Sequence, residues 1–242
     1  MTSGGSRVAL VTGAGGGIGA AVVRRLAARE FIVAAIDLRA SWCDTAWDTA
    51  GPRQAGLWTF GADLSFLHEA EAAVTRVAET LGPPTVIVNA PFPGRADLAP
   101  DLPDWESLVQ ARLRAPLLVS RAAERYLTET GGRIITVAQT GLAARRPDDL
   151  VVRETLHALT ETLSQELAPH GVLVNTVVAE LNCANPAPDG AGSRADCCLA
   201  VVNETAAMVE FLAVEADDGI TGRMIEARHP APESPPGAST LR

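Results

Sequence analysis

Lysine is absent from this chain of 242 residues: its 20 basic residues are all arginines, and tyrosine occurs once, as Tyr126. Chemistry that needs a catalytic lysine is therefore excluded, including Schiff-base mechanisms and a tyrosine that a lysine activates. Long apolar runs are also missing, since no stretch reaches the roughly 18 residues of a membrane-spanning helix. The start MTSGGSRVAL has no apolar signal-peptide core, so we expect a cytoplasmic protein.

Positive charge is scarce, because 20 basic residues stand against 29 acidic ones and the net charge is −9. Such an acidic surface repels phosphate groups, which excludes nucleic acids and anionic membranes as partners. There is no C-x-x-C motif and the histidines are scattered, so we predict no metal site. The four cysteines, Cys43, Cys183, Cys197 and Cys198, are expected to be free thiols. Cys197 and Cys198 are interpreted as small apolar residues in a loop, with a redox-active pair as the alternative.

Short runs rich in valine and isoleucine alternate with longer helical stretches. These runs are apolar throughout, which is typical of parallel strands buried on both faces. The predicted strands are Val8–Thr12, Phe31–Asp37, Leu57–Ala62, Thr85–Asn89, Arg133–Val137, Val172–Val178 and Met224–Ala227, and the predicted helices cover about 18–29, 66–81, 105–130, 150–169 and 204–213. The alternation predicts an α/β fold with one Rossmann-like, doubly wound parallel sheet of about seven strands.

We expect a single domain over residues 1–228. Residues 40–56 are interpreted as a weak helical region or loop. Residues 179–203 contain proline, glycine, asparagine and aspartate, and this composition predicts a loop over the cleft at the strand ends. The proline-rich residues 229–242 are predicted to be a disordered tail.

The segment TGAGGGIG at residues 12–19 follows the first predicted strand and opens a helix. Glycines at this place let backbone amides approach a pyrophosphate at the helix N-terminus. Asp37 ends the second strand, where a carboxylate binds ribose hydroxyls and disfavours a 2′-phosphate. Arg39 lies close by in the sequence, and its positive charge weakens this preference for NAD over NADP. We therefore predict a site for NAD(P), with NAD favoured by Asp37.

Together with further motifs, this segment resembles the short-chain dehydrogenase/reductase family over nearly the whole chain. Residues 12–19 match its T-G-x-x-x-G-x-G loop, and GADL at 61–64 resembles the segment whose aspartate holds the adenine. VNA at 88–90 resembles its N-N-A-G stretch, and LSQELAPHGVLVN at 163–175 resembles the helix that leads into the sixth strand. The resemblance implies cofactor-binding roles for Gly13, Gly17, Ile18, Gly19, Asp37, Asp63 and Asn89.

Catalysis in this family depends on an Asn, Ser, Tyr and Lys tetrad, and the flanking matches locate all four positions here. Arg112 stands at the Asn position, Gln139 at the Ser position, Asp149 at the Tyr position and Arg153 at the Lys position. The threonine that binds the nicotinamide amide falls near Ala184. The resemblance therefore implies that the adenine end of the cofactor site persists and that standard hydride transfer is lost, so no catalytic residue is assigned.

Two interpretations of the replaced positions stay open. Asp149 and Arg153 are four residues apart on one predicted helix, which predicts a surface ion pair that contributes about 0.3–0.5 kcal/mol. The alternative is a new acid/base or anion site built from Arg112, Asp149 and Arg153. Cys183 is a weaker nucleophile candidate, because no base lies near it in the sequence.

Family members form oligomers by packing two helices into a four-helix interface, here about 105–130 and 150–169. The resemblance therefore implies a non-catalytic subunit in a hetero-oligomer with an active relative, acting on a hydroxy or keto acyl group on a carrier protein. It is similar in kind to the non-catalytic partner of the β-hydroxytyrosyl dehydrogenase complex of aminocoumarin antibiotic biosynthesis. The alternatives are a stand-alone isomerase, dehydratase or cyclase, and an NAD-sensing regulatory protein.

Overall fold

A parallel sheet of seven strands in the order β3-β2-β1-β4-β5-β6-β7 forms the centre of the molecule. The computed structural model describes residues 7–48, 56–91, 105–140, 147–180 and 194–227. The strands are β1 (Val8–Thr12), β2 (Ile32–Asp37), β3 (Leu57–Gly61), β4 (Pro84–Asn89), β5 (Gly132–Thr140), β6 (Val172–Glu180) and β7 (Arg223–Ala227). The Rossmann-like doubly wound sheet predicted from the sequence is confirmed.

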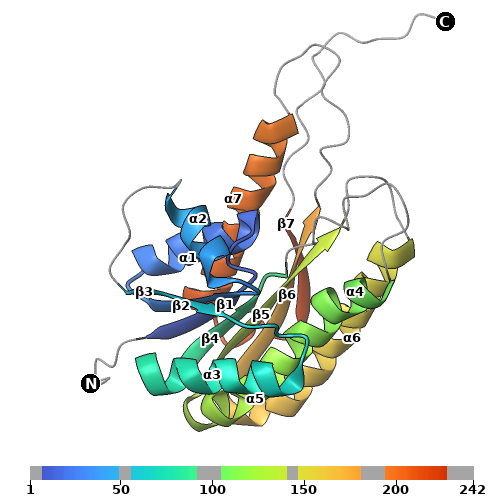
Figure 1. Ribbon diagram of the computed structural model, residues 1–242. Coiled ribbons are helices and arrows are strands. Elements are labelled where there is room, and N and C mark those ends of the chain that lie inside the picture. The colour runs from blue at the N-terminus through green and yellow to red at the C-terminus, as the bar shows by residue number, and fades with distance from the viewer. Residues whose placement is uncertain (1–6, 49–55, 92–104, 141–146, 181–193, 228–242) are drawn as a thin grey trace, which may run out of the picture.

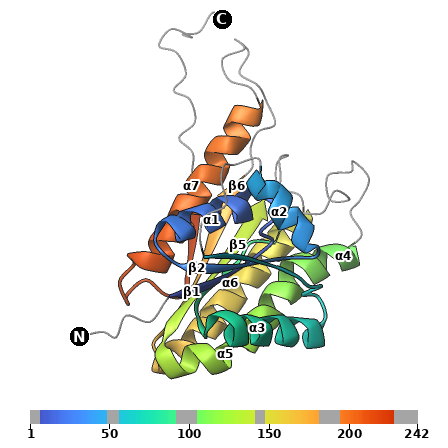
Figure 2. The same ribbon diagram turned by 60° about the vertical axis from the view of Figure 1, so that its left-hand side comes forward.

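Helices cover both faces of this sheet (Figures 1 and 2). The helical elements are α1 (Gly17–Ala28), α2 (Ala40–Asp48), α3 (Leu67–Leu81), α4 (Trp105–Val109), the π-helical turn η2 (Gln110–Arg114), α5 (Ala115–Thr130), α6 (Pro147–Leu167), the 3-10 turn η3 (Ala168–His170) and α7 (Arg194–Val214). Helices α1, α2 and α7 lie on one face, and α3, α5 and α6 lie on the other. Each face has its own apolar core, because valine and isoleucine in β1, β2 and β4 point alternately to either side.

The strand order reverses between β1 and β4, whose C-terminal residues Thr12 and Asn89 are paired in register. Consecutive crossovers leave in opposite directions from these two strands. In open α/β sheets, ligands bind in the crevice outside the carboxyl ends of the strands at such a switch point. The fold therefore places the glycine-rich segment and the end of β4 beside the same crevice.

Helix α7 begins ten residues earlier than predicted, at Arg194 rather than about residue 204. The prediction of a loop over 179–203 is therefore wrong at both ends, since Ala179 and Glu180 belong to β6 and 194–203 are helical. The prolines and glycines of this segment all precede Arg194, and the following RADCCLAVVN contains good helix formers. Cys197 and Cys198 consequently lie in a helix, not in a loop.

Other segments of the chain also differ in part from their predicted secondary structure or lie outside the described residues. Residues 40–48 of the predicted weak region form α2, and the predicted helix over 105–130 is interrupted by the π-helical turn η2. Cys183 and the predicted tail at 229–242 lie outside the described residues. Within the described ranges, no helix combines the length and apolarity needed to cross a membrane.

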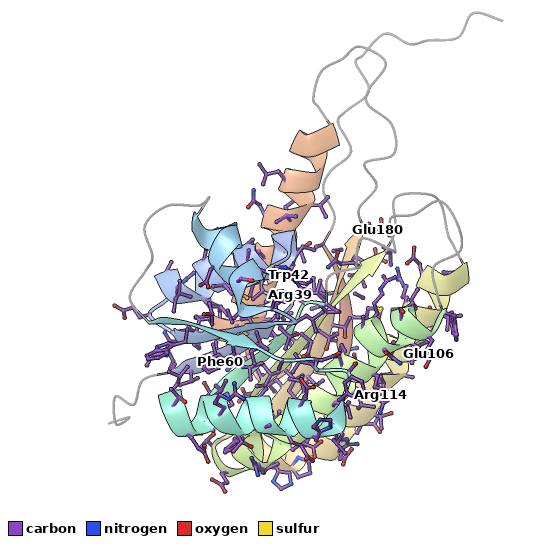
Figure 3. The ribbon with its side chains drawn as sticks, viewed as in Figure 1. Arg39, Trp42, Phe60, Glu106, Arg114 and Glu180 are labelled. Atoms are coloured by element: carbon purple, nitrogen blue, oxygen red, sulfur yellow. The ribbon has the colours of Figure 1, made fainter. Side chains whose placement is uncertain are left out.

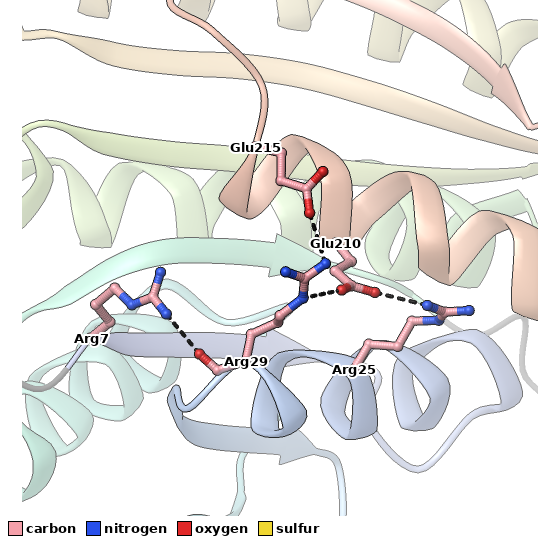
Figure 4. A network of polar contacts seen from close by, with 5 residues as sticks. All are labelled: Arg7, Arg25, Arg29, Glu210 and Glu215. Carbon is pink, nitrogen blue, oxygen red and sulfur yellow. Dashed lines mark hydrogen bonds and ion pairs between the residues drawn. The ribbon is translucent and has the colours of Figure 1, made fainter.

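A cluster of charged side chains joins the C-terminal ends of α1 and α7 (Figure 4). Glu210 accepts hydrogen bonds from Arg25 at 2.8 Å and from Arg29 at 2.5 Å, and Arg29 also contacts Glu215 at 2.7 Å. Arg7, just before β1, donates to the main-chain oxygen of Arg29 at 2.7 Å. This α1–α7 cluster fixes α1, which follows the glycine-rich segment, to α7.

Candidate functional site

The loop between β1 and α1 is shaped by close backbone contacts that only glycine permits. Gly13 has a φ of 63°, in the left-handed region. A Cβ on Gly19 would collide with the main-chain oxygen of Gly13, so α1 could not approach the loop. No side chain caps α1 at Gly16. The first amides of a helix have no intrahelical acceptor, so those of α1 can donate to a phosphate group placed in the crevice.

Asp37 ends β2 beside this loop, and two main-chain amides orient its carboxylate. Oδ2 accepts a hydrogen bond from the Gly15 amide at 2.9 Å, and Oδ1 accepts one from the Leu38 amide at 2.8 Å. Each carboxylate oxygen has a second lone pair for another donor. The carboxylate is thus fixed at the place where the sequence predicted contact with ribose hydroxyls.

Two partly exposed side chains, Leu38 and Trp42, follow Asp37 in the chain and give this end of the crevice an apolar rim. Leu38 is 53% exposed and Trp42 is 45% exposed. The Arg39 guanidinium lies 5.6 Å from the centroid of the Trp42 ring. Figure 3 shows Arg39 and Trp42 close together at the start of α2, well away from Arg114 beside α4.

Asp63 and Asn89, which were also predicted to bind the cofactor, are held by neighbouring protein groups. The Asp63 carboxylate accepts hydrogen bonds from the Ser65 hydroxyl at 2.6 Å and the Ser65 amide at 3.1 Å, which shapes the turn before α3. The amide nitrogen of the buried Asn89 side chain donates to Ser120 at 3.1 Å and to the main-chain oxygen of Pro116 at 3.3 Å. The Asn89 side chain is therefore bound to α5.

Arg112 and Asp149, at two of the replaced catalytic positions, form a buried ion pair. Arg112 lies in η2 and Asp149 in the first turn of α6, with Nη1 and Oδ1 3.0 Å apart. The Arg112 side chain is only 8% exposed and that of Asp149 only 11%. A buried guanidinium needs a carboxylate close to it, and the N-terminus of α6 further stabilises the negative charge.

The predicted surface pair between Asp149 and Arg153 is therefore wrong. Arg153 instead forms its ion pair with Glu226 of β7, at 2.9 Å between Nη2 and Oε1. The reason is that α6 begins at Pro147, which places Asp149 in the first helical turn facing η2 rather than solvent. Glu226 was not predicted as a partner, because contacts between α6 and β7 leave no local signal in the sequence.

Gln139, at the position of the family serine, closes the end of β5. Its side-chain nitrogen donates to the main-chain oxygen of Pro91, just after β4, at 2.9 Å, and the residue is buried. The neighbouring Thr140 hydroxyl lies 3.4 Å from the main-chain oxygen of Ala179 in β6. All four replaced positions are thus engaged with other groups of the protein.

Two other described side chains that could act as an acid or a nucleophile are Tyr126, which lies elsewhere, and Cys43, which is poorly reactive. The Tyr126 hydroxyl accepts a hydrogen bond from Arg125 on α5, at 2.8 Å. Burial, together with the nearby carboxylates of Asp37 and Asp44, raises the pKa of Cys43 to about 12, so its thiol stays protonated. In the part of the chain that the structure describes, no group of three histidine, cysteine or carboxylate side chains could hold a metal ion.

Apolar side chains are exposed on the helices of the predicted four-helix interface. Trp105 on α4 is 52% exposed, and Leu150 and Val151 on α6 are 45% and 44% exposed. A small hollow of about 20 Å³ lies between α5 and α6, and Leu117 and Leu159 contribute to its lining. Exposed apolar side chains on such surface helices are typical of a protein–protein contact surface.

The described residues fit one half of a nicotinamide dinucleotide and not the other. The glycine loop, the α1 amides and the fixed Asp37 carboxylate suit an adenosine diphosphate group. At the other end, Arg153 is paired with Glu226 and Asp149 with Arg112, so neither is free to hold a second ribose. The predicted position of the nicotinamide-binding threonine, near Ala184, lies outside the described residues.

Comparison with known proteins identifies a family model, sequence relatives and a protein of similar fold. Residues 7–181 match the short chain dehydrogenase family model. A (3R)-3-hydroxyacyl-CoA dehydrogenase of Canis lupus familiaris is 33% identical over 195 residues, covering 72% of this chain and 73% of that protein. The short-chain reductase protein NovJ of Streptomyces niveus is 35% identical over 181 residues, covering 70% and 67%. The NADH complex of 3-ketoacyl-(acyl-carrier-protein) reductase from Brucella melitensis has a similar fold, with a TM-score of 0.71 and 22% identity over 93% of this chain and 97% of that one.

Proposed function

Because this chain belongs to the short-chain dehydrogenase/reductase family, we propose that it is a non-catalytic member that assembles with an active member and supports its oxidoreductase activity. One observation carries the proposal: the side chains at all four catalytic positions are bound to other parts of the protein. Arg112 pairs with Asp149, Arg153 pairs with Glu226, and Gln139 is bonded to the main chain.

Hydride transfer to a carbonyl needs a group that delivers a proton to the developing alkoxide. Asp149 is bound to Arg112 in a buried ion pair, so its carboxyl group does not face a substrate. Gln139 has no titratable group, and Tyr126 lies on α5 with its hydroxyl bound to Arg125. The chain on its own therefore offers no replacement for the family tyrosine among these side chains.

The proposed partner is a family member with the intact Asn, Ser, Tyr and Lys tetrad. Support comes from the exposed apolar side chains of Trp105, Leu150 and Val151, which a partner would cover. The proposed contact surface comprises α4, α5 and α6. The part of the site that contains the replaced positions Arg112, Gln139, Asp149 and Arg153 is called here the closed catalytic end. Within such a hetero-oligomer, the chain would brace the active subunit through the helices that lie beside this end.

We propose further that the partner acts on a hydroxy or keto acyl group carried as a thioester on a carrier protein, in a bacterial antibiotic pathway. The name of one relative supports the acyl substrate class in part, since that protein is a (3R)-3-hydroxyacyl-CoA dehydrogenase.

A stand-alone enzyme with altered acid/base chemistry is supported less well. That function would need Arg112, Asp149 and Arg153 to face a common substrate. Arg112 and Asp149 instead neutralise each other away from solvent, and Arg153 is directed to β7. The fixed Asp37 carboxylate favours nucleotide sensing as the second candidate, since it keeps a nucleotide contact without catalysis.

The test is turnover by the purified chain, followed as the absorbance of NADH with 3-hydroxyacyl and 3-ketoacyl thioesters. We expect no turnover by the chain alone. Co-expression with the active partner should give a complex whose kcat exceeds that of the partner alone. A steady change of NADH absorbance with the isolated chain would contradict the proposal.

A further inference from the structure

We propose that the nucleotide crevice binds an adenosine diphosphate group, as in ADP or ADP-ribose, and gains nothing from a nicotinamide half. This inference rests on the proposed function, because both depend on the closed catalytic end. The inference goes beyond the proposed function by naming the class of ligand. It follows from the difference between the two ends of one crevice.

The adenosine end is prepared for a ribose with free hydroxyls. Backbone amides of Gly15 and Leu38 hold one lone pair on each Asp37 oxygen, so the carboxylate is fixed before any ligand arrives. The lone pairs that remain can accept hydrogen bonds from the 2′- and 3′-hydroxyls of a ribose. A 2′-phosphate would instead bring a second negative charge against the carboxylate.

The middle of the crevice suits a diphosphate. The φ of 63° at Gly13 and the close approach of Gly19 bring the first turn of α1 against the end of β1. The helix dipole and the free first amides of α1 stabilise negative charge at this place. With Asp37 at one side, the ribose and the diphosphate of a single ligand can be bound together.

Among the residues that the structure describes, the replaced catalytic positions at the opposite end offer no free group to a second ribose. Arg153 would have to leave Glu226, and Asp149 would have to leave the buried Arg112 guanidinium. Separating the buried Arg112–Asp149 pair leaves an uncompensated charge, so a ligand that binds Asp149 would lose as much as it gains. Gln139 is likewise occupied by the Pro91 carbonyl oxygen. A nicotinamide riboside group therefore adds no net affinity.

Isothermal titration calorimetry with ADP, ADP-ribose, NAD⁺ and NADP⁺ tests this inference on the full chain. We expect the Kd for NAD⁺ to lie within about two-fold of that for ADP-ribose, and NADP⁺ to bind at least about ten-fold more weakly. A Kd for NAD⁺ at least about ten-fold below that of ADP-ribose would overturn the inference, as would the absence of ADP and ADP-ribose binding.

Variants separate the two ends of the crevice. Asp37→Asn should weaken ADP-ribose and NAD⁺ alike by at least about ten-fold, whereas Glu129→Gln, an exposed control on α5, should change neither. Arg153→Ala should leave both affinities unchanged, and a selective loss of NAD⁺ affinity would overturn the inference. Tight NAD⁺ binding without turnover would refute this inference alone, whereas turnover would contradict the proposed function.

Discussion

Arg112 and Asp149 each explain why the other is charged in a buried position. Each would be costly as a lone charge in its buried position, and the 3.0 Å contact between them removes that cost. An asparagine and a tyrosine at these positions would need no such contact. The replacement of both by opposite charges therefore indicates that this end of the cleft has become part of the protein's own packing.

Removing one member of the pair should destabilise the fold strongly. We expect Arg112→Met or Asp149→Leu to lower the free energy of unfolding by roughly 3–5 kcal/mol, because the remaining charge is left buried. The double variant Arg112→Met/Asp149→Leu should recover most of this loss. Urea unfolding of the four proteins measures the coupling. Additive losses in the double variant would show that the two side chains do not depend on each other.

Cys43 should be unreactive in the folded protein. Burial, with Asp37 and Asp44 nearby, raises the pKa of its thiol to about 12 from 9.0, so little thiolate exists at pH 8. In a variant with the other three cysteines changed to serine, we expect labelling by a disulfide reagent only after unfolding. Rapid labelling of the native protein would contradict this account.

The same shift makes stability depend on pH at the alkaline end. The unfolded thiol loses its proton above about pH 9, whereas the folded one keeps it up to about pH 12. The stabilising contribution is therefore complete below pH 9 and is lost as the pH rises toward 12. Cys43→Ala should reduce this alkaline slope in urea unfolding, with the other cysteines already replaced.

At the scale of elements, the α1–α7 cluster around Glu210 joins two of the three helices on one face of the sheet. Burial alone would raise the pKa of Glu210, but hydrogen bonds from Arg25 and Arg29 outweigh it and hold the pKa below the ordinary value of 4.5. The contribution of Glu210 is therefore present at neutral pH and is lost as the pH falls through the lowered pKa.

Glu210→Gln should lower the free energy of unfolding by about 1 kcal/mol at pH 7, the upper end for partly exposed ion pairs. The difference from the original chain should shrink at an acid pH below the lowered pKa of Glu210, where its carboxyl group is protonated in both states. Glu129→Gln serves as the control and should have no effect at either pH. A loss of equal size at both pH values would point to packing rather than charge.

The elements that the sequence predicts well are those with a local signal. The valine-rich strands β1 and β2 were located to within one residue, since an unbroken apolar run marks a strand buried on both faces. Helix α7 was started too late because prolines and glycines before residue 194 made the whole segment resemble a loop. The contacts of Arg112 and Arg153 were missed for a different reason: they join residues 37 and 73 positions apart. Such pairings follow only from the fold.

At the scale of the whole molecule, the closed catalytic end and the exposed helices α4 to α6 belong to one side of the sheet (Figure 1). A chain without catalysis can still determine the geometry of a neighbour through such a surface. The account therefore predicts that the surface matters more for function than any residue in the crevice.

A charge placed on this surface should disrupt the complex. We expect Leu150→Asp to weaken binding of the active partner by at least about ten-fold, because the aspartate would be desolvated in an apolar contact. Trp58→Asp on β3 is a matched control, since Trp58 is similarly exposed at 48% but lies at the far edge of the sheet. Size-exclusion chromatography with light scattering measures the result, and equal losses in the two variants would contradict the assignment.

The most direct test of the central claim is native mass spectrometry of the tagged chain purified from its own host. The account predicts a stoichiometric complex with a second short-chain dehydrogenase that carries the intact Asn, Ser, Tyr and Lys tetrad. The same chain isolated only as a monomer or a homo-oligomer would contradict the claim, and would direct attention to Arg112, Asp149 and Arg153 as a site of their own.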